Sequence, residues 1–377
     1  MPNCIPPIVT TDSKRSLVNK TAMSFSEQGP LKTIGKVSKF LGDTINYNCY
    51  SANQKLNWIR QGEYPLDVRI EATKYGLSPY SYVWFGLHKK NPDQYLTDRD
   101  FFRTVNRTYI NTLHNKYVFY TMTKPYIDAL PRLFGMLVDG QYRHPPTGSP
   151  YIDLITLLDS EERVVLKPIR GESGKGVFLL EKTKIGYKLN GDQKRESELL
   201  YILENLGDYL IKEFVQQHIY VDSVFPNATN TLRVYSVIDP QTGEPDVIRA
   251  AHRFGSEESA PVDNWDRGGY CAPVDIDTGR VMDLVVLDSF SRRSRCSHHP
   301  DTGEKISGLA VPYWDDVREI VVRAADLHRG APMVGWDVLV SEDKPVIIEG
   351  NPVPGIHLLQ IEEGIFEDER VAALSAR

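Results

Sequence analysis

Two carboxylates and an amide near the end of the chain have the residue types and spacing of a cation site. Asp337 interrupts an apolar run at Met333–Val340, and Glu349 and Asn351 end a second run at Val346–Ile348. Two apolar runs around a polar turn predict a β-hairpin, in which residues two apart on a strand share a face. Oxygen-only, partly hydrated donors of this kind suit Mg²⁺ that also bridges phosphates.

The register of this hairpin decides whether the donors meet. A three-residue turn, Glu342-Asp343-Lys344, places Asp337 directly opposite Glu349. A four-residue turn places Asp337 on the other face of the hairpin, so that the cluster is lost. An exposed hairpin with ordinary acidic ends is the alternative to a metal site.

A second informative segment joins two short apolar strands through a glycine-rich loop. Residues 164–169 predict one strand, the sequence GESGKG follows at 171–176, and residues 177–180 predict the next strand. Glycines let backbone N–H groups approach an anion closely, so the loop is a candidate phosphate-binding nest. It is not a P-loop, because no Ser or Thr follows the lysine and a strand stands where a helix should. The candidate residues are Gly171, Ser173, Gly174, Lys175 and Gly176. A plain glycine-rich hairpin turn is the alternative.

Two lysines precede this loop in the sequence, and their surroundings differ. Lys167 is a lone cation in a strand of Val, Leu and Ile, where desolvation is costly unless an anion such as phosphate is near. Lys116 follows Asn115, a plausible helix N-cap, although a lysine there is usually a solvated surface residue.

The strand at 209–215 could contribute to a base-binding slot. A strand that leaves a hydrophobic slot and ends in Glu213 could give an adenine ring its apolar walls and edge hydrogen bonds. A core strand with a charged edge accounts for the same residues.

Two arginines lie between these regions in the sequence. Arg233 begins one predicted strand, Arg253 ends the next, and Asp263 and Asn264 follow in a loop. Such a group could hold a carboxylate or a transferring phosphoryl group. In sheets, however, arginine more often pairs with a neighbouring acid.

The elements that must position these residues are visible in the hydrophobic pattern. Helices are predicted over 98–113, from Asn115, from Ser149, over 196–206 and over 315–327. The first forty residues have the composition of a loosely docked arm, and the aromatic-rich segment that follows is expected to pack.

Composition limits the class of protein. The 377 residues are 41% hydrophobic and 25% charged, with a net charge of −6, which argues against nucleic acid as the main partner. The four cysteines form no CxxC pair, as is typical of reduced thiols. No apolar run approaches ~18 residues, so we expect a cytoplasmic protein without a membrane span.

The order of these features resembles the ATP-grasp superfamily. The second half is most similar to the sugar-transfer-associated ATP-grasp branch, which is related to the α-L-glutamate ligase-like proteins. The phrases that match are NTLRVYSVID, HRFG, VDNWDRGGYCAPVDIDTGR, HPDTGEKISGLAVP and GWDVLVSEDKPVIIEGNPVPG. The likeness runs from about Tyr75 to Gln360 and is dense after Val164.

The resemblance implies an α+β fold in which two subdomains clamp ATP, preceded by a family-specific N-terminal region. We therefore expect a flexible arm over 1–40 and the family-specific region over 41–113. The two ATP-grasp subdomains are expected over 114–213, with the lid, and over 214–377, with the metal site.

The resemblance also implies roles for the candidate residues. Lys116 and Lys167 would contact the α- and β-phosphates, and residues 171–176 would form a mobile lid over the β- and γ-phosphates. Glu213 and Val215 would line the adenine slot. The Mg²⁺ ligands would be Asp337, Glu349 and Asn351. Arg233 and Arg253 would balance charge on the γ-phosphate and on an acyl phosphate, beside Asp263 and Asn264. The acid expected to hold the ribose is replaced by QQH at 216–218.

The implied activity is that of an ATP- and Mg²⁺-dependent ligase that joins a carboxylate and an amine through an acyl phosphate. The family suggests surface-polysaccharide synthesis, with an amino acid and a sugar acid as substrates and sugar-transfer enzymes as partners. One alternative is a small-molecule kinase, which would need a general base near Asp263. The others are a non-catalytic nucleotide-binding partner of a sugar transferase and a structural or interaction module.

Overall fold

The computed structural model describes residues 54–60, 62–97, 100–145, 153–171, 174–287 and 293–375. The expected N-terminal arm and the candidate residues Ser149 and Ser173 lie outside these ranges. The helix predicted to start at Ser149 instead begins at Leu154, because the Asp153 carboxylate caps it by accepting from the Thr156 N–H at 2.7 Å. The chain divides into two compact units, Met1–Val83 and Trp84–Arg377, which we describe separately. The boundaries expected near residues 40, 113 and 213 stay predictions.

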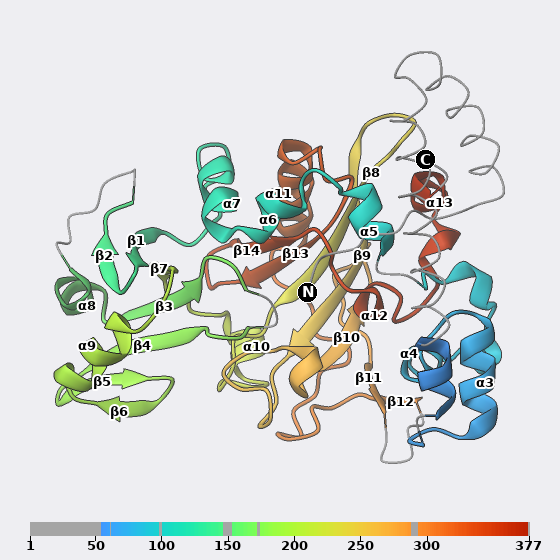
Figure 1. Cartoon of the computed structure of the whole chain (residues 1–377), viewed down its shortest axis with the longest axis horizontal. Helices are drawn as coiled ribbons and strands as arrows, with labels where there is room; N and C mark the ends of the chain where they lie inside the picture. Colours follow the sequence, from blue (N-terminus) through green and yellow to red (C-terminus); the bar gives the residue numbers. More distant parts are fainter. Residues whose placement is uncertain are drawn as a thin grey trace, which may run out of the picture. The chain divides into compact units, whose positions relative to one another are not determined.

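The described part of the first unit is helical. Residues 54–60 form a helix, and α3 (Leu66–Lys74) follows it; α4 (Pro79–Phe85) crosses the boundary between the units (Figure 1). Ala72 and Leu77 are almost fully buried.

The second unit opens with short helices rather than with the single long helix predicted over 98–113. Within that range α5 (Asp100–Val105) and α6 (Ile110–His114) are separated by a turn at 106–109. The buried Asn106 amide donates to the carbonyls of Met333 and Pro352, both at 2.6 Å. The single long helix is therefore wrong: the chain leaves the helix after Val105 in a turn that the Asn106 side chain anchors to these two distant carbonyls. The two 3₁₀ helices before it are η1 (Leu87–Lys89) and η2 (Pro92–Gln94).

The helix predicted from Asn115 is confirmed as α7 (Lys116–Thr123). The Asn115 carboxamide oxygen accepts hydrogen bonds from the N–H groups of Tyr117 and Val118, both at 3.1 Å. This cap fixes the start of the helix and places Lys116 in its first turn.

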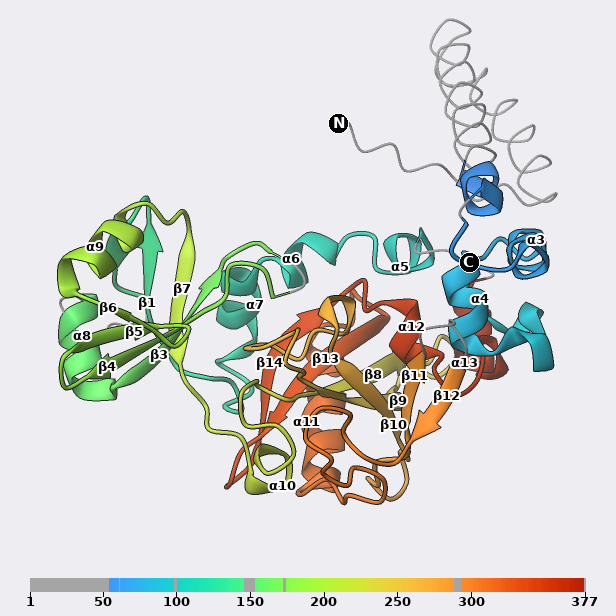
Figure 2. The ribbon, with the colours of Figure 1, turned by 90° about the horizontal axis from the view of Figure 1, so that it is seen from below.

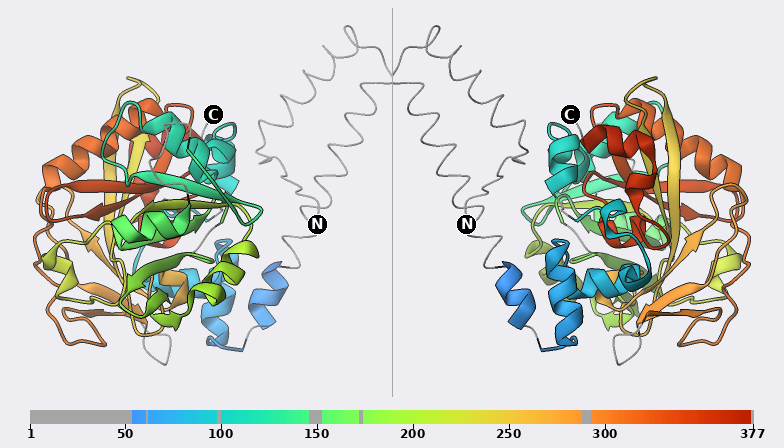
Figure 3. Two further views of the ribbon diagram at one scale, coloured as in Figure 1. Left: turned by 90° about the vertical axis from the view of Figure 1, so that its left-hand side faces the viewer. Right: turned by 90° about the vertical axis from the view of Figure 1, so that its right-hand side faces the viewer.

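The first sheet of this unit has seven antiparallel strands in the order β2-β1-β7-β3-β4-β5-β6. Its helices α8 (Leu154–Glu161) and α9 (Glu196–Glu204) pack against one face through leucines such as Leu157 and Leu199. The left view of Figure 3 looks onto these two helices. Its strands are β1 (Leu133–Val138), β2 (Gln141–Arg143), β3 (Arg163–Pro168), β4 (Phe178–Thr183), β5 (Gly186–Leu189), β6 (Asp192–Lys194) and β7 (Tyr209–Glu213).

The second sheet also has seven antiparallel strands, in the order β12-β11-β10-β9-β8-β13-β14 (Figure 2). The amphipathic helix α11 (Trp314–Leu327) packs against it through Val317, Val321 and Ala324, and contacts β8, β9, β13 and β14. Its strands are β8 (Leu232–Ile238), β9 (Pro245–Phe254), β10 (Tyr270–Val274), β11 (Leu284–Leu287), β12 (Arg293–Cys296), β13 (Met333–Val340) and β14 (Pro345–Asn351). The remaining helices are α10 (Ile219–Asp222), η3 (Trp265–Arg267), α12 (Ile356–Leu359), η4 (Ile365–Glu367) and α13 (Glu369–Ser375).

One apolar core connects the two sheets. It joins Phe119 and Tyr120 of α7 and Leu210 of β7 to Val234 of β8 and Trp336 of β13. Among the described helices, none combines the length and the apolar character that crossing a membrane requires.

The hairpin predicted near the end of the chain is confirmed as β13 and β14, but not with a three-residue turn. Val340 pairs with Pro345, which leaves a four-residue connection at 341–344. By itself, this turn would put Asp337 and Glu349 on opposite faces.

A β-bulge restores the register. Val338 pairs with Ile347 and Asp337 pairs with Glu349, so Ile348 is the additional residue on β14. A bulge sets two residues opposite one. The expectation that a four-residue turn separates the two carboxylates is therefore wrong, because the bulge compensates for the longer turn.

Candidate functional site

One face of the second sheet carries the charged residues singled out in the sequence. Asp337 lies between two strands, opposite Glu349 on β14 and opposite Arg233 on β8. Directly opposed residues of antiparallel strands share a face, so these three side chains project from the same side of the sheet.

Asp337 is held by both arginines. Its Oδ1 accepts from Arg233 Nε at 2.5 Å, and its Oδ2 accepts from Arg253 Nη2 at 3.0 Å. Burial of Asp337 disfavours its charge, but the two adjacent guanidinium groups hold the pKa of this carboxyl well below its usual range. Arg233 Nη1 also donates to the Pro354 carbonyl at 2.5 Å. The two arginines therefore occupy both oxygens of Asp337.

Asp263 extends this network, whereas Asn264 does not. Asp263 Oδ2 accepts from the N–H and the hydroxyl of Thr231, at 2.7 and 2.6 Å, and lies 3.4 Å from Arg253 Nε. Burial raises the pKa of Asp263 despite these partners. Asn264 instead caps η3, its side-chain oxygen accepting from the N–H of Asp266 at 2.8 Å.

Lys116 links three segments at this face. Its Nζ lies 3.6 Å from Glu349 Oε2 and donates to the carbonyl of Gly171 at 2.8 Å. Its backbone N–H donates to the Ile169 carbonyl at 3.0 Å. The lysine expected at a phosphate therefore lies between the hairpin carboxylate and the beginning of the glycine-rich loop.

Lys167 of β3 faces the same carboxylates from the first sheet. Burial lowers the pKa of Lys167, and Glu349, Asp337 and Asp263 act in the opposite direction. None of the described residues forms a hydrogen bond or a close ion pair with Lys167 Nζ, which is consistent with a cation that meets an external anion.

A third lysine, Lys212 of β7, was missed by the sequence analysis. Lys212 pairs with Val165 and Lys167 pairs with Leu210, so both lysines project from one face of the first sheet. Its side chain is almost fully buried, with Nζ 5.3 Å from the centre of the Tyr120 ring. Burial, followed by the charge of Lys167, lowers the pKa of Lys212 to about 7. The signal was available, since Lys212 is also a lone lysine in an apolar strand.

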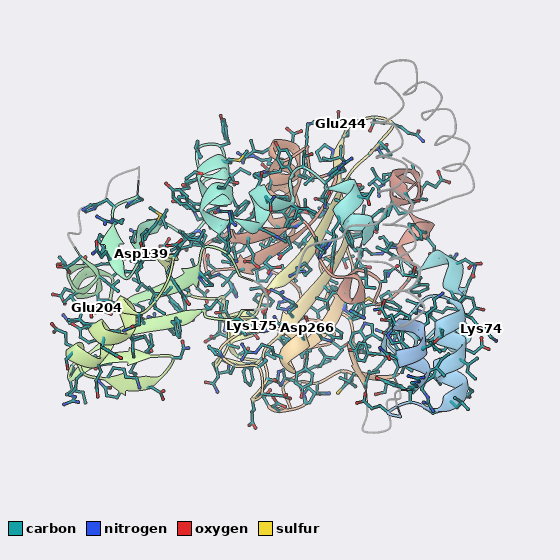
Figure 4. All side chains as sticks on the ribbon, in the orientation of Figure 1. Lys74, Asp139, Lys175, Glu204, Glu244 and Asp266 are labelled. Atoms are coloured by element: carbon teal, nitrogen blue, oxygen red, sulfur yellow. The ribbon has the colours of Figure 1, made fainter. Side chains whose placement is uncertain are left out.

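The glycine-rich loop joins antiparallel β3 and β4, as predicted. Gly174 and Gly176 have φ angles of 66° and 73°, which other residues rarely adopt. A Cβ on Gly174 would lie 3.2 Å from Val262 Cγ2, so the loop reaches the residue next to Asp263. Lys175 is exposed in this loop (Figure 4).

The two residues expected at an adenine ring are not part of this cluster. Glu213 pairs with Val164, and its carboxylate accepts from the N–H of Arg132 at 2.9 Å and lies 3.2 Å from the Arg132 guanidinium. It therefore projects from the face of β7 opposite to Lys212. Val215 follows the strand and is half-buried. Gln217, at the position of the missing ribose ligand, is buried and bonds Asp222.

The donors expected to hold Mg²⁺ form an incomplete shell by themselves. Within the described residues, no group of three or more His, Cys, Asp or Glu side chains could hold a metal ion. Glu349 and Asp337 are opposed across the hairpin, and Asn351 shares the face of Glu349. The Asn351 Nδ2 atom is buried without a hydrogen-bond partner. A Mg²⁺ ion held here would share the Asp337 oxygens with the two arginines and take phosphate oxygens and water as its remaining ligands.

Comparison with known proteins identifies related sequences. A family model described as sugar-transfer associated ATP-grasp matches residues 97–373. No curated protein gives a significant match.

Solved structures of low sequence identity are also similar. An N5-carboxyaminoimidazole ribonucleotide synthetase from Thermotoga maritima has 13% identity and a TM-score of 0.34, covering 64% of this chain and 42% of that one. A D-alanine–D-alanine ligase from Bacillus anthracis has 11% identity and a TM-score of 0.38, with 70% and 68% covered. The chain thus spans less than half of the synthetase.

Proposed function

This chain belongs to the sugar-transfer associated ATP-grasp family and has the ATP-grasp fold, and from that premise we propose that it is an ATP- and Mg²⁺-dependent carboxylate–amine ligase. In the proposed reaction a substrate carboxylate oxygen attacks the γ-phosphorus of ATP, and ADP leaves. An amine then attacks the acyl carbon, and phosphate leaves with the formation of an amide. Because the family is described as sugar-transfer associated, we extend the proposal to a sugar acid and an amino acid as substrates, in surface-polysaccharide synthesis beside a sugar-transfer enzyme.

The observation that carries this proposal is the preformed charged face between the two sheets. Lys116 and Lys167 approach the hairpin carboxylates from α7 and β3. Phosphoryl transfer requires charge neutralisation and positioning more than covalent help, and fixed cations supply both. Mg²⁺ bound at Asp337, Glu349 and Asn351 would neutralise phosphate charge during the transfer.

The arginine pair gives the transferred group a place to lie. Arg253 is bound to Thr231, Asp263 and Asp337, so its guanidinium is oriented before any substrate binds. Such a guanidinium can hold an anionic carboxylate or phosphoryl oxygen without reorganisation. Residues 171–176 would close over the phosphates and exclude water, which protects an acyl phosphate from hydrolysis.

The contacts of Asp263 favour a ligase over a kinase. A kinase needs a carboxylate that is free to accept a proton from a substrate hydroxyl. One oxygen of Asp263 already accepts two hydrogen bonds from Thr231, and Arg253 lies beside it. This carboxylate is therefore better suited to orient Arg253 than to act as a general base.

The test is Mg²⁺-dependent ADP release against a panel of amino acids and uronic acids, with hydroxylamine as a trap. Hydroxylamine attacks an acyl phosphate, so we expect a hydroxamate with one acid and none without ATP. ADP release with a stable phosphorylated hydroxyl and no hydroxamate would overturn the ligase in favour of the kinase. ATP binding without turnover by any acid would favour the non-catalytic nucleotide-binding partner.

A further inference from the structure

Lys212 is a buried cation without a partner in the described part of the chain. Only 4% of its surface is exposed, and no described residue accepts a hydrogen bond from its Nζ. The contact with the Tyr120 ring, at 5.3 Å, is the interaction that its ammonium group does make. A buried charge is costly unless it is paired, so a cation–π contact alone compensates it poorly.

The charged groups around Lys212 leave its positive charge poorly compensated. Its strongest charged neighbours are Lys167, Glu349 and Lys116, in that order. Glu349 is already 3.6 Å from Lys116 Nζ, and Lys124, also nearby, is paired with Asp128. Among these neighbours Glu349 is therefore the one carboxylate that acts on Lys212, and it is already engaged by Lys116, which leaves the Lys212 ammonium without an anion of its own among the residues that the structure describes.

The position of Lys212 relates it to the nucleotide cradle. In the β3–β7 pair it lies diagonally from Lys167, further from the glycine-rich loop. Diagonal neighbours on one face of an antiparallel pair are about 7–8 Å apart, which long side chains can bridge. One polyphosphate can thus contact both ammonium groups.

We propose that Lys212 is a nucleotide-binding residue that donates to a non-bridging phosphate oxygen of the nucleotide held by Lys167. This inference rests on the proposed function, because it requires that the site binds a nucleotide. It adds a residue to the site: the third lysine completes a cationic surface on the first sheet, opposite the carboxylates of the second. The buried charge weakens the empty protein and is compensated when the phosphates arrive.

Lys212→Met tests the assignment, because methionine keeps an unbranched side chain and removes the charge. Lys182→Met is the matched control, a lysine of the same sheet that is exposed and paired with Asp159. We would measure dissociation constants for ATP and for adenosine by calorimetry or competition, and thermal unfolding without ligand. We expect Lys212→Met to bind ATP ten- to a hundredfold more weakly, to bind adenosine as the wild type does, and to unfold no earlier than the wild type.

Two results would overturn the inference. One is unchanged ATP affinity in folded Lys212→Met, and the other is an equal loss for adenosine and ATP, which would place Lys212 at the base or in the core. If Lys212→Met does not fold, Lys212→Gln provides the same comparison. A wild-type protein that binds no ATP would instead overturn the proposed function, so the two failures are distinguishable.

Discussion

The charged side chains of this site differ in how well their charges are compensated. Asp337 lies between Arg233 and Arg253 and has no unpaired oxygen. Glu349 has one long ion pair, and Lys212 has none. Removing a member of a buried pair typically costs ~3–5 kcal/mol, so Asp337→Asn is expected to damage the fold as well as the chemistry. A substitution of Glu349 is therefore a better test of the proposed Mg²⁺ site than a substitution of Asp337.

Glu349→Gln removes a charged donor from a half-buried position. We expect Mg²⁺-dependent turnover to fall by at least about a hundredfold, comparable to the loss of one strong electrostatic contact in a transition state. Asp343→Asn, in the exposed turn of the same hairpin, is the control and should retain activity. Steady-state kinetics over a Mg²⁺ titration measures the effect, and full activity of Glu349→Gln would exclude Glu349 as a ligand.

Lys167→Ala removes a cation from the proposed phosphate site. We expect ATP binding to weaken by about 1.5–3 kcal/mol, the usual contribution of a charge-assisted hydrogen bond. Equilibrium titration with ATP is the measurement. Lys182→Ala, which removes an exposed lysine from the same sheet, is the control. Equal affinities of the two variants would remove Lys167 from the site.

The low pKa of Lys212 leads us to expect an unusual dependence of the free energy of unfolding on pH. Its pKa is about 7 in the folded protein, whereas lysine in an unfolded chain titrates near 10.4. Between these values the unfolded chain binds the proton and the folded protein does not, so raising the pH stabilises the fold. Relative to Lys212→Met, the free energy of unfolding of the wild type should rise by roughly 1–2 kcal/mol from pH 7 to pH 9. Denaturant titrations of both proteins at both pH values measure this difference. An equal change in the free energy of unfolding for the wild type and for Lys212→Met would contradict it.

At the scale of elements, the hydrophobic pattern predicted most of what positions the site. The hairpin, the two strands around the glycine-rich loop and the cap at Asn115 follow from local signals, and all are present. The single helix expected over 98–113 is instead two helices, and the turn between them is anchored by the Asn106 side chain to a distant strand. A contact of that kind has no local signature in the sequence.

Gly176 connects the loop conformation to its expected role as a lid. Its φ is 73°, and an added Cβ would lie 2.8 Å from the Tyr209 hydroxyl. Gly191→Ala is a matched control, with φ of 87° but open space around it. Both alanines should cost about 1 kcal/mol of stability. We expect only Gly176→Ala to weaken ATP binding and turnover, and equal kinetics would argue against the lid.

At the scale of the whole molecule, a ligand bound between the sheets should stabilise both. Phe119, Leu210 and Trp336 belong to one core that spans α7, β7 and β13. At a hundredfold excess over its dissociation constant, a ligand adds about 2.7 kcal/mol to the free energy of unfolding. We expect ATP with Mg²⁺ to raise the melting temperature by several degrees, and EDTA to remove part of this shift. Thermal unfolding with each addition measures the change in melting temperature. A change that is the same with and without EDTA would exclude Mg²⁺ from the site.

The assembly of the site was less accessible from sequence than its parts. Asp337, Glu349 and Arg233 could be singled out individually, but their pairing depends on strand register. In the strand at 209–215 the acid, Glu213, was chosen as the ligand-binding residue. The fold instead directs Glu213 toward Arg132 and directs Lys212 toward the site. The sequence pattern of a strand does not indicate which face of that strand lies toward the other sheet.

The bulge at Ile348 has a consequence for how this hairpin can vary through evolution. Deleting Ile348 would leave Val338 against Ile347 and Asp337 against Glu349, so a one-residue gap there would not move the carboxylates. A gap between Gly335 and Asp337 would shift Asp337 to the opposite face. Within a set of homologous genes, a one-residue length change should therefore be tolerated at the bulge on β14 and selected against between Gly335 and Asp337 on β13.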